Sequence, residues 1–355
     1  MNSYIEHERL LSPGIGASES QADKNLRPKS FPEYLGQDAV KEQMGIFVEA
    51  ARLRGEALDH VLMFGPPGLG KTTLAHVVAF ELGAGFQVTS GPILTRPGDL
   101  AAILSQLEAK TVLFIDEIHR MQPAVEELLY SAMEDYHIDV LLGQGAGARS
   151  MRIQLPPFTL IGATTRAGAL TAPLRERFGI IQRLEYYNIE ALALIIQRSA
   201  RILHMNLEEG GVHAIASRAR GTPRIANRLL RRVRDVVEVR GISKINAAHA
   251  HEALNMLKVD ELGLDHQDRR LLEVIKTHFS GGPVGLDSLS VALGESRDTV
   301  EDVIEPYLIQ QGMLQRTAKG RVTTIRAREY LESHGSLTQI GNSSDLTLFS
   351  ADHLV

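Results

Sequence analysis

A phosphate-binding loop is the clearest chemical motif in the chain. The segment from Gly65 to Thr72 reads GPPGLGKT and matches the spacing G-x-x-x-x-G-K-T in full. Gly68 and Gly70 let backbone N–H groups converge on phosphate oxygens, and a helix that opens at Lys71 adds its partial positive charge. We expect Lys71 to reach the β- and γ-phosphates and Thr72 to offer its hydroxyl to Mg²⁺. The loop therefore predicts binding of Mg-ATP.

Two carboxylates follow a second apolar run. Asp116 and Glu117 come directly after VLFI, so a buried strand would deliver both to the sheet edge beside the phosphate loop. Asp116 is predicted to hold the Mg²⁺ shell. Glu117, one residue on and pointing elsewhere, is predicted to orient and polarise the attacking water. Without the phosphate loop, a solvated acidic pair at a strand end would be the favoured interpretation.

Three later segments carry further groups that could act on a triphosphate. FTLIGATT ends at Thr164 and Thr165, where a hydroxyl could bond the γ-phosphate or the water, or could be a satisfied strand-end threonine. APLRERFG carries Arg175 and Arg177, which could stabilise transition-state charge on a neighbouring subunit's nucleotide or form a surface salt bridge. Arg224 in GTPRIAN starts a predicted helix and could close on the nucleotide, or could be a helix-surface charge.

The elements around these motifs predict an α/β protein of several domains. Buried strands at 61–64, in TVLFIDE and in FTLIGATT alternate with helices at 38–54 and 71–82, which indicates a parallel sheet covered on both faces. The pattern then becomes all helical, and finally gives three short helices and a two-stranded ribbon, as in a winged helix. We predict a flexible arm over 1–25, a large ATPase domain over 26–187, a small all-α lid over 188–258, a winged-helix domain over 259–331 and a disordered tail over 332–355.

Length and composition are consistent with this division. A chain of 355 residues is long enough for two or three domains. It has no cysteine, which excludes disulfides and thiolate metal sites and fits a cytoplasmic location. No apolar run approaches the ~18 residues of a membrane span, and we expect no signal peptide. The net charge of −5 means that any contact with nucleic acid needs a local basic patch.

A glycine-rich segment between the second and third strands predicts a β-hairpin. In HIDVLLGQGAGARSMRIQL, two short apolar stretches flank a glycine-rich centre, so the chain turns back on itself over about 138–154. Such a tip most often only turns the chain. A hairpin that projects and binds a partner is the alternative.

The predicted ribbon near the carboxyl end is basic. Its segment from 316 to 328 has no acidic residue, so it could lie along a DNA backbone and neutralise phosphates, or be a solvated charged hairpin. Arg297, near the start of the preceding helix, is a weaker candidate. That helix is acidic and makes a poor reader of the major groove. The basic residues of the segment are Arg316, Lys319, Arg321, Arg326 and Arg328.

Together these motifs resemble the AAA+ superfamily. GPPGLGKT, FIDE, GATT, LRERFG and GTPR occur in that superfamily's order of phosphate loop, Mg²⁺ carboxylates, first sensor, arginine finger and second sensor. Longer segments, among them LRPKSFPEYLGQ, FIDEIHR and GTPRIANRLLRRVRD, are similar to the RuvB family of Holliday-junction motors. The resemblance runs from about residue 26 to residue 331.

The resemblance implies roles for individual residues. Thr164 would be the first sensor, Arg177 a finger acting in trans, and Arg224 the second sensor. Leu26, Arg27 and Tyr187 would line an adenine pocket. The full set near nucleotide would be Leu26, Arg27, Gly65, Gly68, Gly70, Lys71, Thr72, Thr73, Glu134, Asp135, Tyr136, Arg177, Tyr187 and Arg224, with Asp116, Glu117 and Thr164 at the reacting phosphate and Arg297, Arg316 and Arg321 on DNA.

The resemblance also implies an ATP-driven DNA motor. It would work as a ring, expected to be a hexamer, in recombination, DNA repair and the SOS response to DNA damage. The hairpin over 138–154 would dock the partner RuvA, and the resolvase RuvC could join the complex. The alternatives are an AAA+ initiator or loader with a winged helix, and a nucleotide-gated binding module that hydrolyses little ATP.

Overall fold

The structure is a computed structural model that describes residues 25–142 and 149–334. The chain divides into two compact units, one over 13–253 and one containing residues from Leu254 onward. We describe each unit by itself. The predicted arm over 1–25 lies outside the described residues except for Asn25, and the tail after residue 334 also lies outside them.

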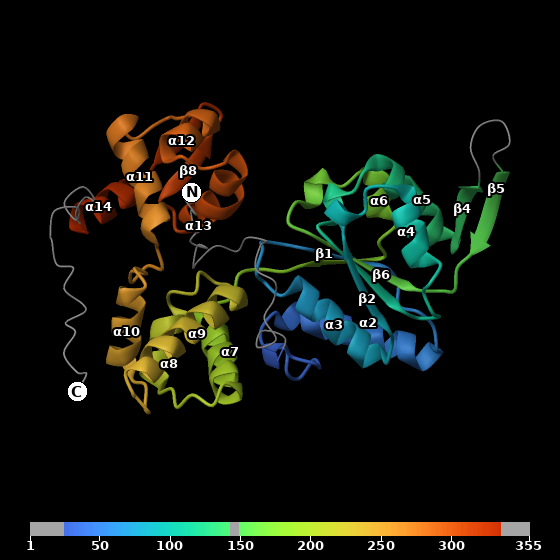
Figure 1. Ribbon diagram of the computed structural model, residues 1–355, viewed down its shortest axis with the longest axis horizontal. Helices are drawn as coiled ribbons and strands as arrows, with labels where there is room; N and C mark the ends of the chain where they lie inside the picture. Colours follow the sequence, from blue (N-terminus) through green and yellow to red (C-terminus); the bar gives the residue numbers. More distant parts are fainter. Residues whose placement is uncertain (1–24, 143–148, 335–355) are drawn as a thin grey trace, which may run out of the picture. The chain divides into compact units, whose positions relative to one another are not determined.

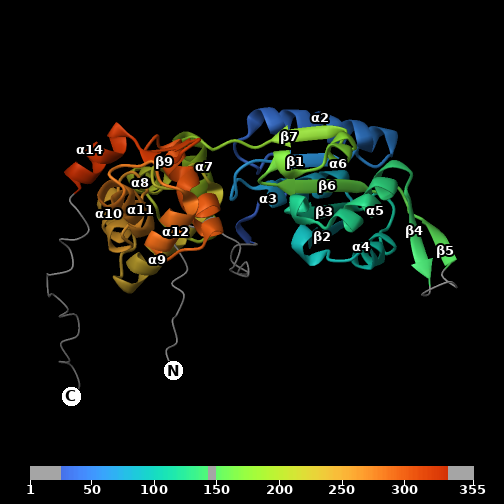
Figure 2. The same cartoon turned by 90° about the horizontal axis from the view of Figure 1, so that it is seen from above.

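A five-stranded parallel sheet forms the centre of the first unit. Its strands run in the order β2-β3-β6-β1-β7 (Figure 2). The outer strand β2 spans Phe86–Ser90 and the other outer strand β7 spans Ile180–Arg183. Between them lie β3 (Val112–Asp116), β6 (Thr159–Thr164) and β1 (Val61–Phe64). Because every pairing is parallel, the carboxyl ends of all five strands lie along one edge of the sheet.

Helices cover both faces of this sheet, as the apolar strands predicted. Helices α2 (Asp38–Arg54) and α3 (Lys71–Leu82) lie on one face, and α4 (Pro97–Leu104), α5 (Pro123–Glu134) and α6 (Ala172–Glu176) on the other (Figure 1). Phe158 is fully buried in the core of the second face, whereas Phe114 of β3 is fully buried against Phe86 of β2, whose ring contacts His76 of α3. All six residues of β6 are buried, as expected for a strand that is covered on both sides.

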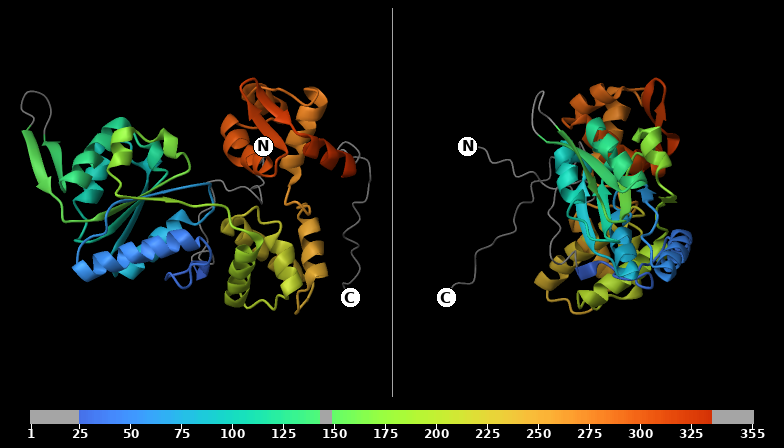
Figure 3. Two further views of the ribbon diagram at one scale, coloured as in Figure 1. Left: turned by 180° about the vertical axis from the view of Figure 1, so that it is seen from behind. Right: turned by 90° about the vertical axis from the view of Figure 1, so that its right-hand side faces the viewer.

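The predicted hairpin is present. Strands β4 (His137–Leu142) and β5 (Arg149–Gln154) pair antiparallel with each other and form a separate two-stranded sheet. They extend away from the central sheet (Figure 3). Arg152 donates to both carboxylate oxygens of Asp139 across the ladder, at 3.1 and 3.3 Å. The glycine-rich tip, residues 143–148, lies outside the described residues.

A helical segment follows the sheet. It consists of α7 (Ile189–Ile202), α8 (Glu209–Ala216), α9 (Pro223–Val239) and α10 (Ala247–Met256). The side chain of Asn188 caps α7 by accepting from the N–H of Ala191. Helix α9 buries one stripe at helical spacing, formed by Ile225, Ala226, Leu229, Leu230, Val233 and Val237.

The second unit is the predicted winged helix. Helices α11 (His266–His278) and α12 (Leu286–Leu293) precede a π-helical turn, η5 (Thr299–Ile304), which continues into α13 (Glu305–Gln310). The hairpin of β8 (Leu314–Thr317) and β9 (Gly320–Thr323) forms the wing, and α14 (Ile325–Ser333) closes the domain. One apolar core joins these elements, with fully buried Leu271, Leu289, Leu308 and Met313.

The wing is shorter than the sequence predicted. Strand pairing ends at Thr323, and the hydroxyl of Thr324 accepts from the N–H of Ala327 and so starts α14. Arg326 and Arg328 therefore lie on a helix and not on the wing. Helix α14 also includes residues 332 and 333, so the helix extends into the segment predicted as a disordered tail.

A glycine in the middle of the sheet gives a test of the packing. A Cβ on Gly162 would lie 2.9 Å from Cδ1 of Ile118 and 3.0 Å from Cζ of Phe178, whereas a Cβ on Gly45 in α2 would meet nothing within 4 Å. We expect Gly162→Ala to lower the free energy of unfolding by ~1–3 kcal/mol through overpacking. The control Gly45→Ala should raise it by ~0.5–1 kcal/mol by favouring the helix. Denaturant unfolding of the two variants checks this order, and equal stability would contradict it.

Candidate nucleotide-binding and catalytic site

The phosphate loop requires its glycines for steric reasons. Gly65, Gly68 and Gly70 have φ values of 147°, 82° and 95°, where side chains are strongly disfavoured. A Cβ on Gly65 would also lie 2.4 Å from the carbonyl oxygen of Leu184. The loop ends where α3 begins at Lys71, so the free N–H groups of the first helical turn belong to the same cradle.

Lys71 is buried at the centre of this cradle. Only 7% of the residue is exposed, and its ammonium donates to the carbonyl oxygens of Gly65 at 2.8 Å and Pro66 at 3.0 Å. Burial lowers the pKa of Lys71 to about 8, although the nearby Asp116 and Glu117 oppose that shift. A cation held in such a place has lost much of its hydration and gains by receiving an anion.

The two carboxylates have different partners and stand on either side of one backbone turn. Asp116 is the last residue of β3, and its Oδ1 accepts the N–H of Glu117 at 2.9 Å. Glu117 has a left-handed φ of 47°, and the chain then enters the short helix η2 (Ile118–Arg120). Burial and the charge of Asp116 raise the pKa of Glu117. A raised pKa makes this carboxylate more basic, which suits a group that polarises water.

Oxygen donors near the loop fit a magnesium ion. Asp116 offers a carboxylate and Thr72 a hydroxyl, and Mg²⁺ prefers such hard ligands with several waters retained. Both residues stand at the carboxyl edge of the sheet, since Thr72 lies in the first turn of the helix that follows β1. They are the residues that would hold the ion against the phosphates, and the ion would supply neutralisation of phosphate charge.

His119 joins the catalytic carboxylate to the sensor strand. Its Nδ1 lies 2.9 Å from Oγ1 of Thr164 and 3.2 Å from Oε2 of Glu117. Thr164 is fully buried, and its hydroxyl also accepts from the N–H of Arg166. Thr165 donates to the same Oε2 of Glu117 at 3.4 Å. Thr164 is thus linked to Glu117 through His119, whereas Thr165 contacts Glu117 directly.

Segments that are far apart in the chain form the side of the site where the adenine base is expected to bind. Leu26 is buried, and its carbonyl oxygen accepts from Nη1 of Arg198 on α7 at 2.7 Å. Arg27 beside it is half-buried. The phenol of buried Tyr187 donates to the carbonyl of Leu69 in the phosphate loop at 3.3 Å and lies 3.3 Å from the phenol of Tyr34. These contacts fix the entry segment, the loop and the first lid helix to one another.

Arg224 approaches the same loop from the start of α9. Its N–H donates to the carbonyl of Gly68 at 3.4 Å, and its Cβ limits the space above that glycine. Its charge also lowers the pKa of Lys71. The predicted second sensor therefore shares a loop with the lysine in the same chain. The structure itself brings together Lys71, Thr72, Asp116, Glu117, Thr164 and Arg224.

Arg177 stands at the opposite edge of the sheet. It comes three residues before β7, whose first residue Ile180 pairs with Val61, the first residue of β1. The phosphate loop follows the last residue of β1, so the length of the strand, about 10 Å at ~3.3 Å per residue, separates the two. Arg177 donates to Glu134 at 2.8 Å and to the carbonyl of Pro173.

Glu134, Asp135 and Tyr136 lie on this second edge as well. The ring nitrogen Nε2 of His60, which precedes β1, lies 3.1 Å from the carbonyl oxygen of Met133. Tyr136 has a φ of 50° and packs edge-on against Phe158. The four residues predicted to meet a neighbour's nucleotide thus lie along one edge of the sheet. The chain's own phosphate loop lies at the opposite edge.

Models of three protein domains match the chain in succession. The Holliday junction DNA helicase RuvB P-loop domain matches residues 26–184, the RuvB AAA lid domain residues 187–260, and the RuvB C-terminal winged helix domain residues 261–332. The chain belongs to the RuvB family. Its order of sheet, lid and winged helix is the order of these three models, which confirms the predicted fold class.

Solved structures of RuvB proteins agree with this assignment. The Thermotoga maritima RuvB Holliday junction branch migration motor is 50% identical, with a TM-score of 0.80 over 87% of this chain and 98% of that one. A lysine-to-arginine variant and an arginine-to-alanine variant of RuvB from the same organism match at 50% identity over 86% of this chain and 98% of theirs, with TM-scores of 0.80 and 0.79. The predicted motor ATPase is thereby favoured over the initiator or loader.

RuvB membership and the loop geometry together make this chain a P-loop AAA+ ATPase that binds nucleotide. The individual site residues remain predictions, as do the domain boundaries at 187/188 and 258/259.

Sequence reasoning missed three groups that the structure places at the site, namely His119, Tyr34 and Arg198. Only His119 left a signal, as a polar residue three positions after Asp116. No helix among residues 25–142 and 149–334 is long and apolar enough to cross a membrane.

The contact of His119 with both Glu117 and Thr164 predicts a positioning role. We expect His119→Ala to lower kcat for ATP by about 10- to 100-fold, because misplacement of a catalytic group by ~1 Å can cost that much. The KM for ATP should change little, since the contacts of His119 with Glu117 and Thr164 act on the reacting groups. His119→Asn, whose amide can occupy the place of Nδ1, should restore much of the rate.

Steady-state kinetics of the two variants checks this, with the exposed lid residue His213 replaced by Ala as the control. A purely structural role predicts equal losses for His119→Ala and His119→Asn, together with a lowered melting temperature. That pattern would contradict the positioning role.

Proposed function

We propose that this chain hydrolyses ATP between the subunits of a ring and uses the energy to drive branch migration of Holliday junctions. One observation carries the proposal: Arg177 and the phosphate loop lie at opposite edges of the same parallel sheet. A finger that cannot reach its own nucleotide can complete only a neighbour's site. Repeated head-to-tail contacts of this kind close into a ring when the rotation fits, and we propose a hexamer.

In the proposed cycle, each residue acts from its own edge. Lys71 and the loop amides hold the triphosphate, Asp116 and Thr72 hold Mg²⁺, and Glu117 takes a proton from the attacking water. Arg177 of the adjacent subunit faces the γ-phosphate and offsets the charge that develops there. Glu134, Asp135 and Tyr136 accompany Arg177 at that boundary. Leu26, Arg27, Tyr187 and Arg224 link occupancy of the site to the lid.

The hairpin is proposed to dock RuvA. It pairs only with itself, and Met151 on it is 43% exposed and stands opposite half-buried Val140. An exposed apolar side chain such as Met151 on a projecting ribbon is suited to a protein partner rather than to DNA. Arg297, Arg316 and Arg321 of the winged-helix unit are proposed to contact duplex phosphates. A cytoplasmic location and an association with RuvC complete the proposal.

Mixed assemblies test action in trans. Arg177→Ala and Glu117→Gln should each reduce ATP turnover by at least ~10³-fold, because each removes one half of the site. Mixed in equal amounts they should recover activity, since about a quarter of randomly formed interfaces join an intact site to an intact finger. The measurement is ATP turnover of the mixture after subunit exchange. If Arg177 served its own subunit, the mixture would stay inactive.

The partner and substrate are tested by junction dissociation. A synthetic four-way junction with RuvA, ATP and Mg²⁺ should separate into duplexes when this chain is added, and Glu117→Gln should bind nucleotide without that effect. Met151→Asp should lose dissociation with RuvA yet keep duplex-independent ATP turnover, because it charges the proposed docking surface only. Dissociation that is unchanged by Met151→Asp would remove the hairpin from the proposal.

A further inference from the structure

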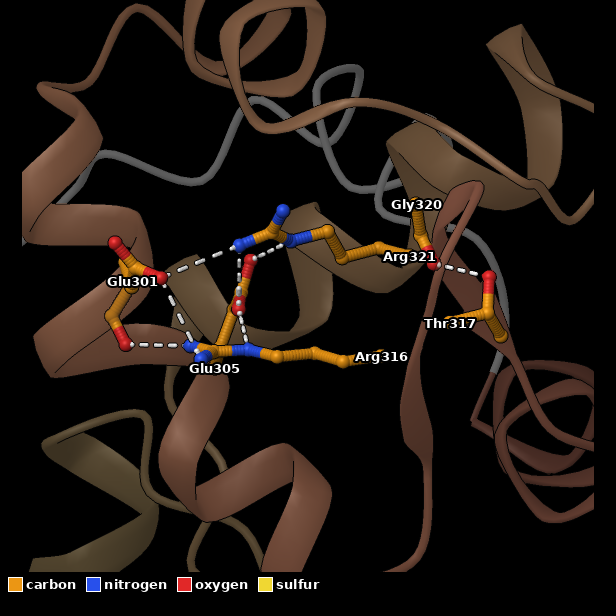
Figure 4. A network of polar contacts seen from close by, with 6 residues as sticks. All are labelled: Glu301, Glu305, Arg316, Thr317, Gly320 and Arg321. Carbon is orange, nitrogen blue, oxygen red and sulfur yellow. Dashed lines mark hydrogen bonds and ion pairs between the residues drawn. The ribbon is translucent and has the colours of Figure 1, made fainter.

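The three arginines proposed to contact DNA are all paired with carboxylates of their own domain. Arg316 on β8 and Arg321 on β9 are cross-strand partners, and both guanidinium groups turn toward Glu305 at the start of α13 (Figure 4). Arg297 pairs with Asp287 at 2.8 Å. The Arg297 pair is exposed on both sides and is weakened by solvent. The pairs of Arg316 and Arg321 differ because their shared partner, Glu305, is buried.

Glu305 anchors the wing from inside the domain. Its side chain is 0% exposed, and its two oxygens accept from Nε of Arg321 and Nε of Arg316, each at 2.7 Å. Arg321 adds a second bond from Nη2 at 3.3 Å. A buried carboxylate with two charge-assisted partners holds the β-ribbon against α13. We therefore regard Glu305 as a structural residue.

Glu301 lies one turn earlier and contacts the same two guanidinium groups. Its Oε1 is 3.5 Å from Nη1 of Arg316 and 3.7 Å from Nη2 of Arg321. Its side chain is 35% exposed, so it stands between the buried Glu305 and solvent. The carbonyl of Glu301 also accepts from Nη2 of Arg316 at 3.0 Å. Both terminal nitrogens of Arg316 thus lie against Glu301, Nη1 near its carboxylate and Nη2 on its backbone carbonyl.

The formal charges of this cluster cancel. Arg316 and Arg321 contribute two positive charges, and Glu301 and Glu305 two negative ones. A phosphate that approaches Arg316 meets a neutral group and must compete with a carboxylate already in contact. Binding through counterion release depends on the net positive charge offered to the backbone, so the paired wing offers less than its sequence suggests.

We propose that Glu301 is an internal competitor for the DNA phosphates that Arg316 binds, and that it holds down the duplex affinity of the winged-helix domain. The inference rests on the proposed contact between the wing and DNA. A phosphate displaces the half-exposed Glu301 and leaves the buried Glu305 clamp intact, so the guanidinium stays oriented. Contacts of this kind are weak and quickly reversed, as a protein that moves along a duplex requires.

The test compares two uncharged replacements in the full-length protein. Glu301→Gln removes the competing charge while keeping the shape of the side chain. Asp298→Asn, three residues earlier, removes the same charge from an exposed position without an ion pair to any described residue. Affinity for a duplex of random sequence is measured by fluorescence anisotropy over a range of salt concentrations, and melting curves check folding. Glu301→Ala serves as a second variant.

We expect Glu301→Gln to bind duplex about three- to tenfold more tightly than Asp298→Asn, with a salt slope steeper by ~0.9, the value for one added phosphate contact. The gain should vanish in the double variant Glu301→Gln with Arg316→Ala, because it operates through Arg316. Equal binding by Glu301→Gln, Glu301→Ala and Asp298→Asn would overturn the inference.

The same binding measurements distinguish failure of the proposed DNA contact from failure of the competition by Glu301. If Arg316→Ala and Arg321→Ala leave duplex affinity unchanged, the wing does not bind DNA, and the inference falls together with that part of the proposal. If Arg316→Ala weakens binding while Glu301→Gln has no effect beyond its control, the DNA contact stands and only the competition by Glu301 is rejected.

Discussion

The parallel register of β1 with its neighbours is the constraint on which the rest of the first unit depends. Phe64, the last residue of β1, lies opposite Thr164 on β6, and Asp116 ends the adjacent strand β3. One edge therefore collects the phosphate loop, the carboxylates and the sensor threonines. The same register places the start of β7, and Arg177 just before it, at the other edge. We propose that a site divided in this way is complete only when two copies meet.

Local chemistry made much of this predictable. The sequence predicts strand Val61–Phe64, the phosphate loop and α3 in detail. Few structures are compatible with this glycine spacing after an uninterrupted apolar run. The outer strands β2 and β7 were not predicted. Burial in β7 alternates along Ile180–Arg183, and β2 is mostly half-exposed, so neither shows the continuous apolar pattern of a central strand. Only the pairing in the folded sheet identifies them.

Tertiary contacts account for the remaining differences at the sites. Tyr34 and Arg198 act through partners 153 and 172 residues away in the chain, and such distances leave no local pattern. The wing arginines show the same limit in another way. Arg316 and Arg321 read as free basic residues in the sequence, and the fold pairs both with Glu305, an acidic residue of the preceding helix. The charge that the wing presents is thus set by the fold and not by composition.

The central claim is that catalysis requires two subunits, and dilution tests it most directly. ATP turnover per subunit, measured across protein concentrations that span ring assembly as followed by sedimentation, should rise in step with the assembled fraction. In dilute, unassembled protein it should fall to the level of Arg177→Ala. Turnover per subunit that stays constant while the ring dissociates would contradict the account.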